Sequence, residues 1–220
     1  SHVQKGYEMV IGNLDASAAI VVLDHHQSWD GHGFPEHGHF GAEPAPRHGH
    51  DIHVFARIVA AADAYDRLLH RVDGGTWPRV RAMNTLLNSP LNGRFDPVVL
   101  AVMPVVAPPY PPGSQITLSD GQRAFVLDWD AEAPCRPVVV PMKDPKDGMP
   151  PNADGHDAPA ESIDLRVRPD LLIVEQDGQD VAADNFEFAY RKALLDARSR
   201  SDACGDVQPT SPPGSLERAA

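Results

Sequence analysis

The sequence predicts a mainly α-helical chain that is followed by a small antiparallel β module. Apolar residues recur at helical spacing in several segments before residue 107. Beyond that point, β-forming residues alternate with polar ones on both sides of Asp120-Gly121, a pair that is typical of hairpin turns. The 22 prolines are too many for an evenly helical chain. Part of the molecule must therefore be loop, edge strand or tail.

The helical part is expected to begin with a short, mildly amphipathic stretch over residues 3–11. The next segment, "LDASAAIVVLDHHQ", reads as a helix with Asp15 as its N-cap and Gly31 beyond its end. A loop rich in Gly, Pro and His follows it. The alanine-rich segment "DIHVFARIVAAADAYDRLLHR" is the clearest helix of the chain. Two further helices are expected near residues 77–88 and 96–106.

The β module is expected to continue beyond its first hairpin. Further strands are predicted at 138–141, 162–167 and 171–175. A long polar loop is predicted over 143–160. A helix is predicted within residues 185–198. The organisation that follows is a helical domain over 1–107, a β extension over 108–178, a C-terminal helix within 179–200 and a disordered tail over 201–220.

Composition excludes several classes of protein. The formal net charge is −12 and no basic run offsets it, so we expect no binding to duplex nucleic acid. The cysteines, Cys135 and Cys204, are far apart, which indicates neither a disulfide framework nor a zinc ribbon. No segment has eighteen consecutive apolar residues, so no membrane association is expected. These features predict a cytoplasmic protein. Because the chain begins inside a predicted helix, we expect it to be the rear part of a longer protein.

Two carboxylates lie on the apolar stripe of the 51–71 helix. At 100° per residue, one direction collects a set of five side chains: Ile52, Phe55, Val59, Asp63 and Asp66. This stripe is predicted to face the core, where an unpaired charge is costly, so the carboxylates need a cation, a proton or a metal ion. In the alternative interpretation, Asp66 pairs with Arg57 or Arg71 and Asp63 points into a wet crevice.

Eight of the eleven histidines fall between His25 and His53, and two of them are adjacent. Clustered imidazoles and carboxylates suit zinc, iron or manganese. Neighbouring side chains on a helix diverge by about 100°, so two adjacent histidines rarely chelate one ion alone. At a helix end they can instead serve two neighbouring ions, or one ion and a phosphate. The alternative is that His26 interacts with the helix dipole and His25 is solvated.

Three motifs in order resemble the HD-GYP family of cyclic di-GMP phosphohydrolases. These motifs are "SHVQKG", "DHHQSWDGHGFP" and "DIHVFARIVAAADAYDRL", and the resemblance covers about residues 1–106. The matched positions are His2 and Gly6 in the first motif, His25, His26, Asp30, Gly31, Gly33 and Pro35 in the second, and Ile52, Arg57, Asp63 and Asp66 in the third. Phe34 stands where tyrosine is usual and Gln27 where glutamate is usual. The β segment after residue 108 is similar to an extension found on some members.

The resemblance implies part of an HD-domain-like helical bundle that hydrolyses cyclic di-GMP to pGpG or GMP in bacterial second-messenger signalling. Its cofactors would be two or three divalent transition-metal ions, iron or manganese, which activate a water for attack on the phosphodiester. By position, the metal ligands would be His2, His25, His26 and Asp63, with Asp63 and His26 as the catalytic residues. The substrate side would be formed by Asp30, Gly31, Gly33, Phe34, Pro35 and Arg57. Asp66 would support the site from behind the ligands or contact Arg57.

Departures from the family pattern keep other interpretations open. The sequence has no His-Asp pair before residue 25, Gln27 removes a carboxylate, and the R-P-Y stretch that often follows Asp66 is absent. These favour a degenerate, non-catalytic HD-GYP domain that binds nucleotide or protein. A third reading is an HD phosphohydrolase for another nucleotide. The expected partners are a cyclic dinucleotide, an upstream sensory or receiver domain, and a signalling protein; the missing His-Asp pair would lie on upstream helices of a longer protein.

Overall fold

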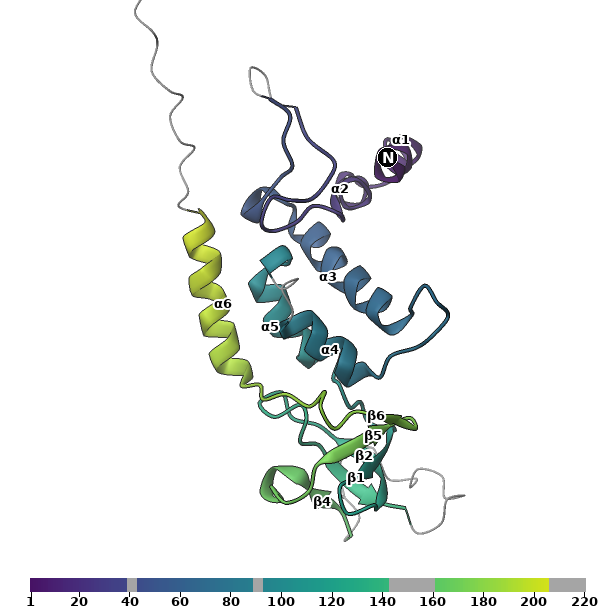
Figure 1. The fold of residues 1–220 in the computed structure, drawn as a ribbon. Coiled ribbons are helices and arrows are strands. Elements are labelled where there is room, and N and C mark those ends of the chain that lie inside the picture. The colour runs from purple at the N-terminus through teal and green to yellow at the C-terminus, as the bar shows by residue number, and fades with distance from the viewer. Residues whose placement is uncertain (39–42, 89–92, 143–160, 206–220) are drawn as a thin grey trace, which may run out of the picture.

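A computed structural model describes residues 1–38, 43–88, 93–142 and 161–205. Figure 1 shows the helical residues 2–24 projecting at one end of the molecule, the helices of residues 54–106 in its middle and the sheet at the other end, with the last helix running along one side. The α-helices are α1 (His2–Val10), α2 (Ala16–Asp24), α3 (Val54–Leu69), α4 (Arg79–Asn88), α5 (Pro97–Val106) and α6 (Tyr190–Gly205). Two 3₁₀ turns are η1 (Gly49–Asp51) and η3 (Leu165–Val167).

The helix beginnings follow from capping residues in the sequence. The predicted N-cap Asp15 is confirmed, because its side chain accepts a hydrogen bond from Ser17 N at 2.8 Å. Asp96 caps α5 in the same way, directly before Pro97 at the first helical position. The long helix begins at Val54 instead of residue 51, since η1 occupies the preceding residues and His53 serves as the N-cap.

The sheet has the strand order β4-β3-β2-β1-β5-β6, and every neighbouring pair is antiparallel. Its strands are β1 (Gln115–Leu118), β2 (Arg123–Asp128), β3 (Val138–Pro141), β4 (Ile163–Asp164), β5 (Ile173–Gln176) and β6 (Gln179–Asp180). The predicted hairpin turn is confirmed between β1 and β2, where Gly121 has φ +84°, a conformation that favours glycine. The predicted strand at 162–167 is shorter, because η3 takes its second half.

The predicted fold class, mainly α with a small β module, is wrong. About 43% of the chain is helical and 15% is strand, which makes this a mixed α/β fold. The sheet is also not an appended extension, because its apolar core includes Val80 from α4, together with Tyr110 and Leu118. Phe186, which precedes α6, contacts both this core and the core between the helices. Helix and sheet therefore share packing that an alternation pattern alone does not reveal.

The C-terminal prediction also needs correction. α6 extends to Gly205, so residues 201–205 are helical and do not belong to a disordered tail. This helix packs along α5 and reaches η1, where His50 Nε2 lies 3.1 Å from Ser201 O. The remainder of the predicted tail and the predicted loop at 143–160 lie outside the described residues.

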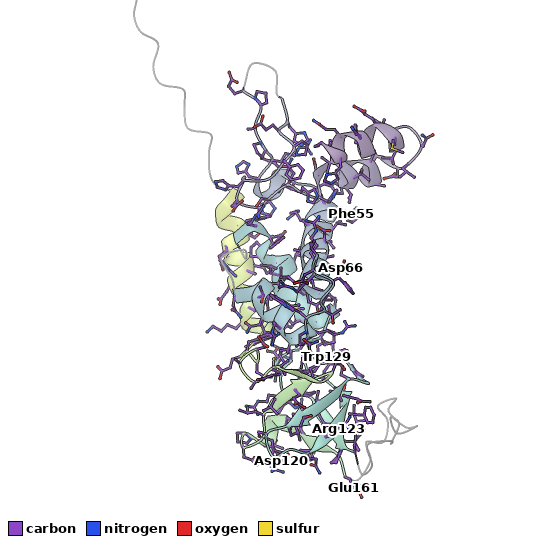
Figure 2. All side chains as sticks on the ribbon, turned by 45° about the vertical axis from the view of Figure 1, so that its right-hand side comes forward. Phe55, Asp66, Asp120, Arg123, Trp129 and Glu161 are labelled. Atoms are coloured by element: carbon purple, nitrogen blue, oxygen red, sulfur yellow. The ribbon has the colours of Figure 1, made fainter. Side chains whose placement is uncertain are left out.

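The stripe of α3 that was predicted to face the core faces outward. Phe55 is 53% exposed and Val59 37% exposed, whereas Ala56, Ala61 and Tyr65 are buried (Figure 2 labels Phe55 on this helix). Small alanine side chains on the inner face let the neighbouring helices approach α3 closely. Among the described residues, no helix is both long enough and apolar enough to span a membrane.

Candidate metal centre

Three histidines converge at the end of the molecule formed by α1 and α2. His2 begins α1, His25 is the C-cap of α2 and His26 follows it. One nitrogen from each imidazole lies within 4.8 Å of the others. His2 Nε2 and His26 Nε2 are 3.1 Å apart. The structure therefore brings together three of the four predicted metal ligands from positions 24 residues apart.

Close packing of α1 on α2 brings His2 to the other two histidines. A Cβ atom on Gly6 would lie only 2.9 Å from Val22 Cγ1, so glycine permits the two helices to approach. Val3, one residue after His2, is buried and anchors the same end of α1. Gly6 of the first motif thus acts through helix packing and sets the position of its histidine.

The geometry of the three imidazoles fits a transition-metal ion. Two nitrogens bound to one ion at about 2.0–2.1 Å lie roughly 2.8–3.4 Å apart for angles between square and tetrahedral, and the His2–His26 separation falls in this interval. His25 Nδ1 lies 3.1 Å from Val22 O and 3.2 Å from Val21 O. If Nδ1 donates to these carbonyls, Nε2 keeps its lone pair for a ligand, as is usual for metal-binding histidines.

The electrostatics of His26 also favour metal binding. Its pKa lies below the usual value because of desolvation first, and then because of positive charge at His25, Arg67 and His2. Asp63 opposes this effect and raises the pKa. A lowered pKa keeps the imidazole neutral further into the acidic range, and the neutral form is the one that binds a metal ion.

Asp63, the fourth predicted ligand, is near the histidines but not within their converging group. It lines a cavity of about 260 Å³ together with His25 and His26, and its carboxylate Oδ2 pairs with Arg67 Nε at 3.0 Å. Asp66 lies on the exposed flank of α3 and pairs with His70 at 3.0 Å, with 70% of its side chain exposed. Among the described residues, Asp66 therefore pairs neither with Arg57 nor with any of the three clustered histidines.

The turn after His26 contains five of the residues predicted on the substrate side. Phe34 stacks on the His26 ring, with centroids 4.8 Å apart, and remains 44% exposed. A Cβ on Gly33 would lie 2.3 Å from Ser28 N, so this glycine is required by the protein's own backbone. Gly31 has φ +81°, and the Phe34–Pro35 peptide bond is cis. Phe34 is thus the member of this turn that directly borders the histidines.

Asp30 stabilises the same turn. Its Oδ1 accepts hydrogen bonds from Ser28 Oγ at 2.6 Å and from His32 N at 3.1 Å. Partial desolvation raises the pKa of Asp30, but these hydrogen bonds outweigh it and the net pKa lies below the usual value. The carboxylate is thus ionised at neutral pH and engaged within the turn.

Gln27 is buried and forms two hydrogen bonds that a carboxylate could not both form. Its Nε2 donates to Pro35 O at 2.6 Å, and its Oε1 accepts from Arg47 N at 3.0 Å. An ionised glutamate lacks the first of these donors. The departure from the family's glutamate is therefore matched to the local backbone.

Arg57, predicted on the substrate side, lies inside the molecule. Its guanidinium pairs with Asp96, which is 4% exposed, and lies 5.5 Å from the centre of the Trp29 ring. Its Nε is buried without a hydrogen-bond partner among the described residues. Arg57 thus joins α3 to the beginning of α5 and to the segment that follows His26.

Sequence reasoning missed two groups of polar residues near the histidines. Asp24 is fully buried beside His25, and its two carboxylate oxygens contact His37 Nε2 at 2.9 Å and Arg47 at 2.8 Å. His37 is thus engaged with a carboxylate. Arg67 and Arg94 line the cavity beside His25 and His26. The adjacency of Asp24 to His25 was the one signal visible in the sequence. The partners of Asp24, His37 and Arg47, come from a loop whose folded position the local pattern does not indicate.

Comparison with protein-family models, with curated proteins and with solved structures found no match to this chain. The described residues provide a cluster of three imidazoles, a carboxylate in the adjoining cavity, and two arginines on the wall of that cavity.

Proposed function

We propose that the chain is the metal-binding part of an HD-GYP-like phosphodiesterase that hydrolyses cyclic di-GMP. The observation that carries this proposal is the convergence of His2, His25 and His26. The order of motifs that contain these histidines supports the substrate class. The cofactor we propose is iron or manganese, with the three histidines as the ligands of one ion and Asp63, in the adjoining cavity, as the carboxylate for a further one.

A bound divalent metal supplies Lewis acidity toward a phosphoryl oxygen and toward water. The chain's own residues would hold and orient the reacting groups. Arg67 engages Oδ2 of Asp63, which leaves Oδ1 as the oxygen that we propose receives a proton from water. His26 stays neutral because of its lowered pKa and is therefore available as a ligand. Phe34 covers one face of His26 and reduces access of bulk water there.

A non-catalytic nucleotide-binding domain is the second candidate. The observation that favours it is the position of Asp63, whose carboxylate pairs with Arg67 instead of joining the three histidines. In this case the site would bind metal and nucleotide without hydrolysis.

The experiment is cyclic di-GMP turnover with Mn²⁺ or Fe²⁺ supplied, followed by chromatography of the products. His26→Ala and Asp63→Asn are compared with two exposed controls, His48→Ala and Asp73→Asn, which lie on loop segments. In a version extended upstream through any encoded His-Asp pair, we expect pGpG or GMP from the parent sequence and both controls, and at least a hundredfold loss of rate in the two site variants. Binding of Mn²⁺ and nucleotide without turnover would contradict the enzyme proposal and support the non-catalytic binding domain. Absence of Mn²⁺ binding would contradict both candidates.

A further inference from the structure

A second cluster of charged side chains lies beside the histidines, in the cavity of about 260 Å³. The open cavity is lined by residues 25–28, by the C-terminal half of α3, by Leu86 of α4, and by Arg94 and Phe95 just before α5. Its ionisable lining consists of His25, His26, Asp63, Arg67 and Arg94. His25 and His26 form part of its wall and also belong to the histidine cluster, so the two sites share a boundary.

The charge of this cavity is opposite to that of the chain. Two guanidinium groups face one carboxylate, whereas the whole chain carries a formal net charge of −12. Asp63 engages Arg67, but no carboxylate of the described residues pairs with Arg94. Within the part of the chain that the structure describes, Arg94 therefore offers a guanidinium without a carboxylate partner at the cavity wall.

Arg94 is tied to the segment that carries the histidines. Its carbonyl accepts a hydrogen bond from Trp29 N at 2.8 Å, and its Nε lies 3.4 Å from Ser28 Oγ. Ser28 is 2% exposed and is itself held by Asp30. Among the described residues, no acceptor engages the two terminal nitrogens of Arg94. These nitrogens form the planar fork that suits phosphate oxygens, and their backbone is fixed relative to His26.

We infer that Arg94 and Arg67 form a phosphate-binding subsite, in which Arg94 contributes the guanidinium that has no carboxylate partner among the described residues. The cavity lies slightly below the roughly 300–1,000 Å³ of pockets that enclose a whole small ligand, so it takes a phosphoryl group with the adjoining sugar of a larger nucleotide. The identity of that nucleotide rests on the proposed function, whereas anion binding does not. Asp63 competes with the phosphate for Arg67 and makes Arg94 the dominant contact.

The test is titration of the metal-free chain with inorganic phosphate. Binding is monitored through the Nε–Hε resonances of the arginines in ¹⁵N NMR spectra. The Arg94 and Arg67 signals are expected to shift, and the Arg71 signal, from an exposed pair with Asp73, is expected to stay in place. Arg94→Gln should weaken phosphate binding about tenfold, since it removes a charge-assisted contact. Arg94→Lys should retain part of the affinity. Arg71→Gln is the matched control and should bind like the parent chain.

Asp63→Asn separates this inference from the proposed function. It releases Arg67, so phosphate should bind more tightly, while cyclic di-GMP hydrolysis should be lost. If phosphate binds and responds to Arg94→Gln but cyclic di-GMP is not hydrolysed, the subsite stands and the enzyme proposal fails. If phosphate leaves the Arg94 signal unchanged, or if Arg94→Gln binds as the parent chain does, the subsite is wrong, whatever the turnover assay gives.

Discussion

The two ends of the molecule are held together by different interactions. At the sheet end, large apolar side chains are fully buried, including Tyr110, Leu118 and Ile173. Gln176 is the buried polar side chain there, and it is hydrogen-bonded to Val80 N and Pro109 O. At the histidine end, the described residues include four buried polar side chains, which are Asp24, Gln27, Ser28 and Asp96.

This difference shows how a site rich in charge is kept in place. Ion pairs and hydrogen bonds fix the direction of their partners, whereas apolar contacts constrain direction less. The polar end is therefore well suited to orient His25 and His26, but its stability depends on complete pairing and on pH. The sheet end supplies apolar burial that does not depend on pH.

The largest expected effect is loss of the buried charge pair at the polar end. Asp96→Asn keeps an N-cap side chain for α5 but leaves the Arg57 guanidinium buried without its carboxylate. The free energy of unfolding should fall by about 3–5 kcal/mol, measured by urea denaturation with circular dichroism. Asp73→Asn, in an exposed and solvent-screened pair, should have a much smaller effect. Equal effects of the two variants would show that the buried pair has no special role.

The next effect is a cavity at the sheet end. Leu118→Ala removes a fully buried side chain and should lower the free energy of unfolding by about 2–5 kcal/mol. Mn²⁺ affinity of the folded variant, measured by calorimetry, should remain that of the parent chain. A change in affinity would show that the two ends are coupled and would remove the contrast between them.

A smaller effect is expected at Gln27, with a definite dependence on pH. In Gln27→Glu, an ionised carboxylate oxygen faces Pro35 O in place of the amide donor. The free energy of unfolding should fall by about 1–3 kcal/mol at pH 7. Below the carboxyl pKa of about 4.3, the protonated form can donate again, so the difference from the parent should shrink as pH falls. Urea denaturation at pH 4 and pH 7 measures it. A difference that grew toward low pH would contradict the assigned hydrogen bonds.

The smallest effect is on the titration of His26 in the metal-free chain. Its lowered pKa means that its contribution to stability is present above about pH 6.5, the usual histidine value, and is lost as pH falls through the folded-state pKa. Arg67→Gln removes a nearby positive charge and should raise this pKa, while Asp63→Asn should lower it further. NMR titration of the His26 ring protons measures both directions. Shifts of the same sign in both variants would contradict the placement of these charges.

Local signals in the sequence predicted much of the fold. Asp15 marked the beginning of α2, and Asp120-Gly121 marked the hairpin between β1 and β2. The pattern on α3 did not show which side is buried, because Phe55 and Val59 are apolar while the true inner face consists largely of alanines. Apolar spacing alone therefore selected the wrong face.

The candidate site was predictable only where the motifs themselves contain the residues. His2, His25 and His26 come together as expected, but Arg57 lies in the interior. The Arg94 position depends on a hydrogen bond between residues 65 positions apart, from Trp29 N to Arg94 O. No local pattern encodes such a contact.

The attachment of α1 has a consequence for how often the site is complete. α1 has nine residues, shorter than the length at which an isolated helix persists in water, and Val3 is its buried apolar residue. It packs chiefly on α2 and lies at the outer end of the molecule (Figure 1). Detachment of α1 is thus among the least costly local openings. Each opening removes His2 and leaves two histidines, so the apparent affinity of a three-histidine site is scaled by the fraction of time that α1 is docked.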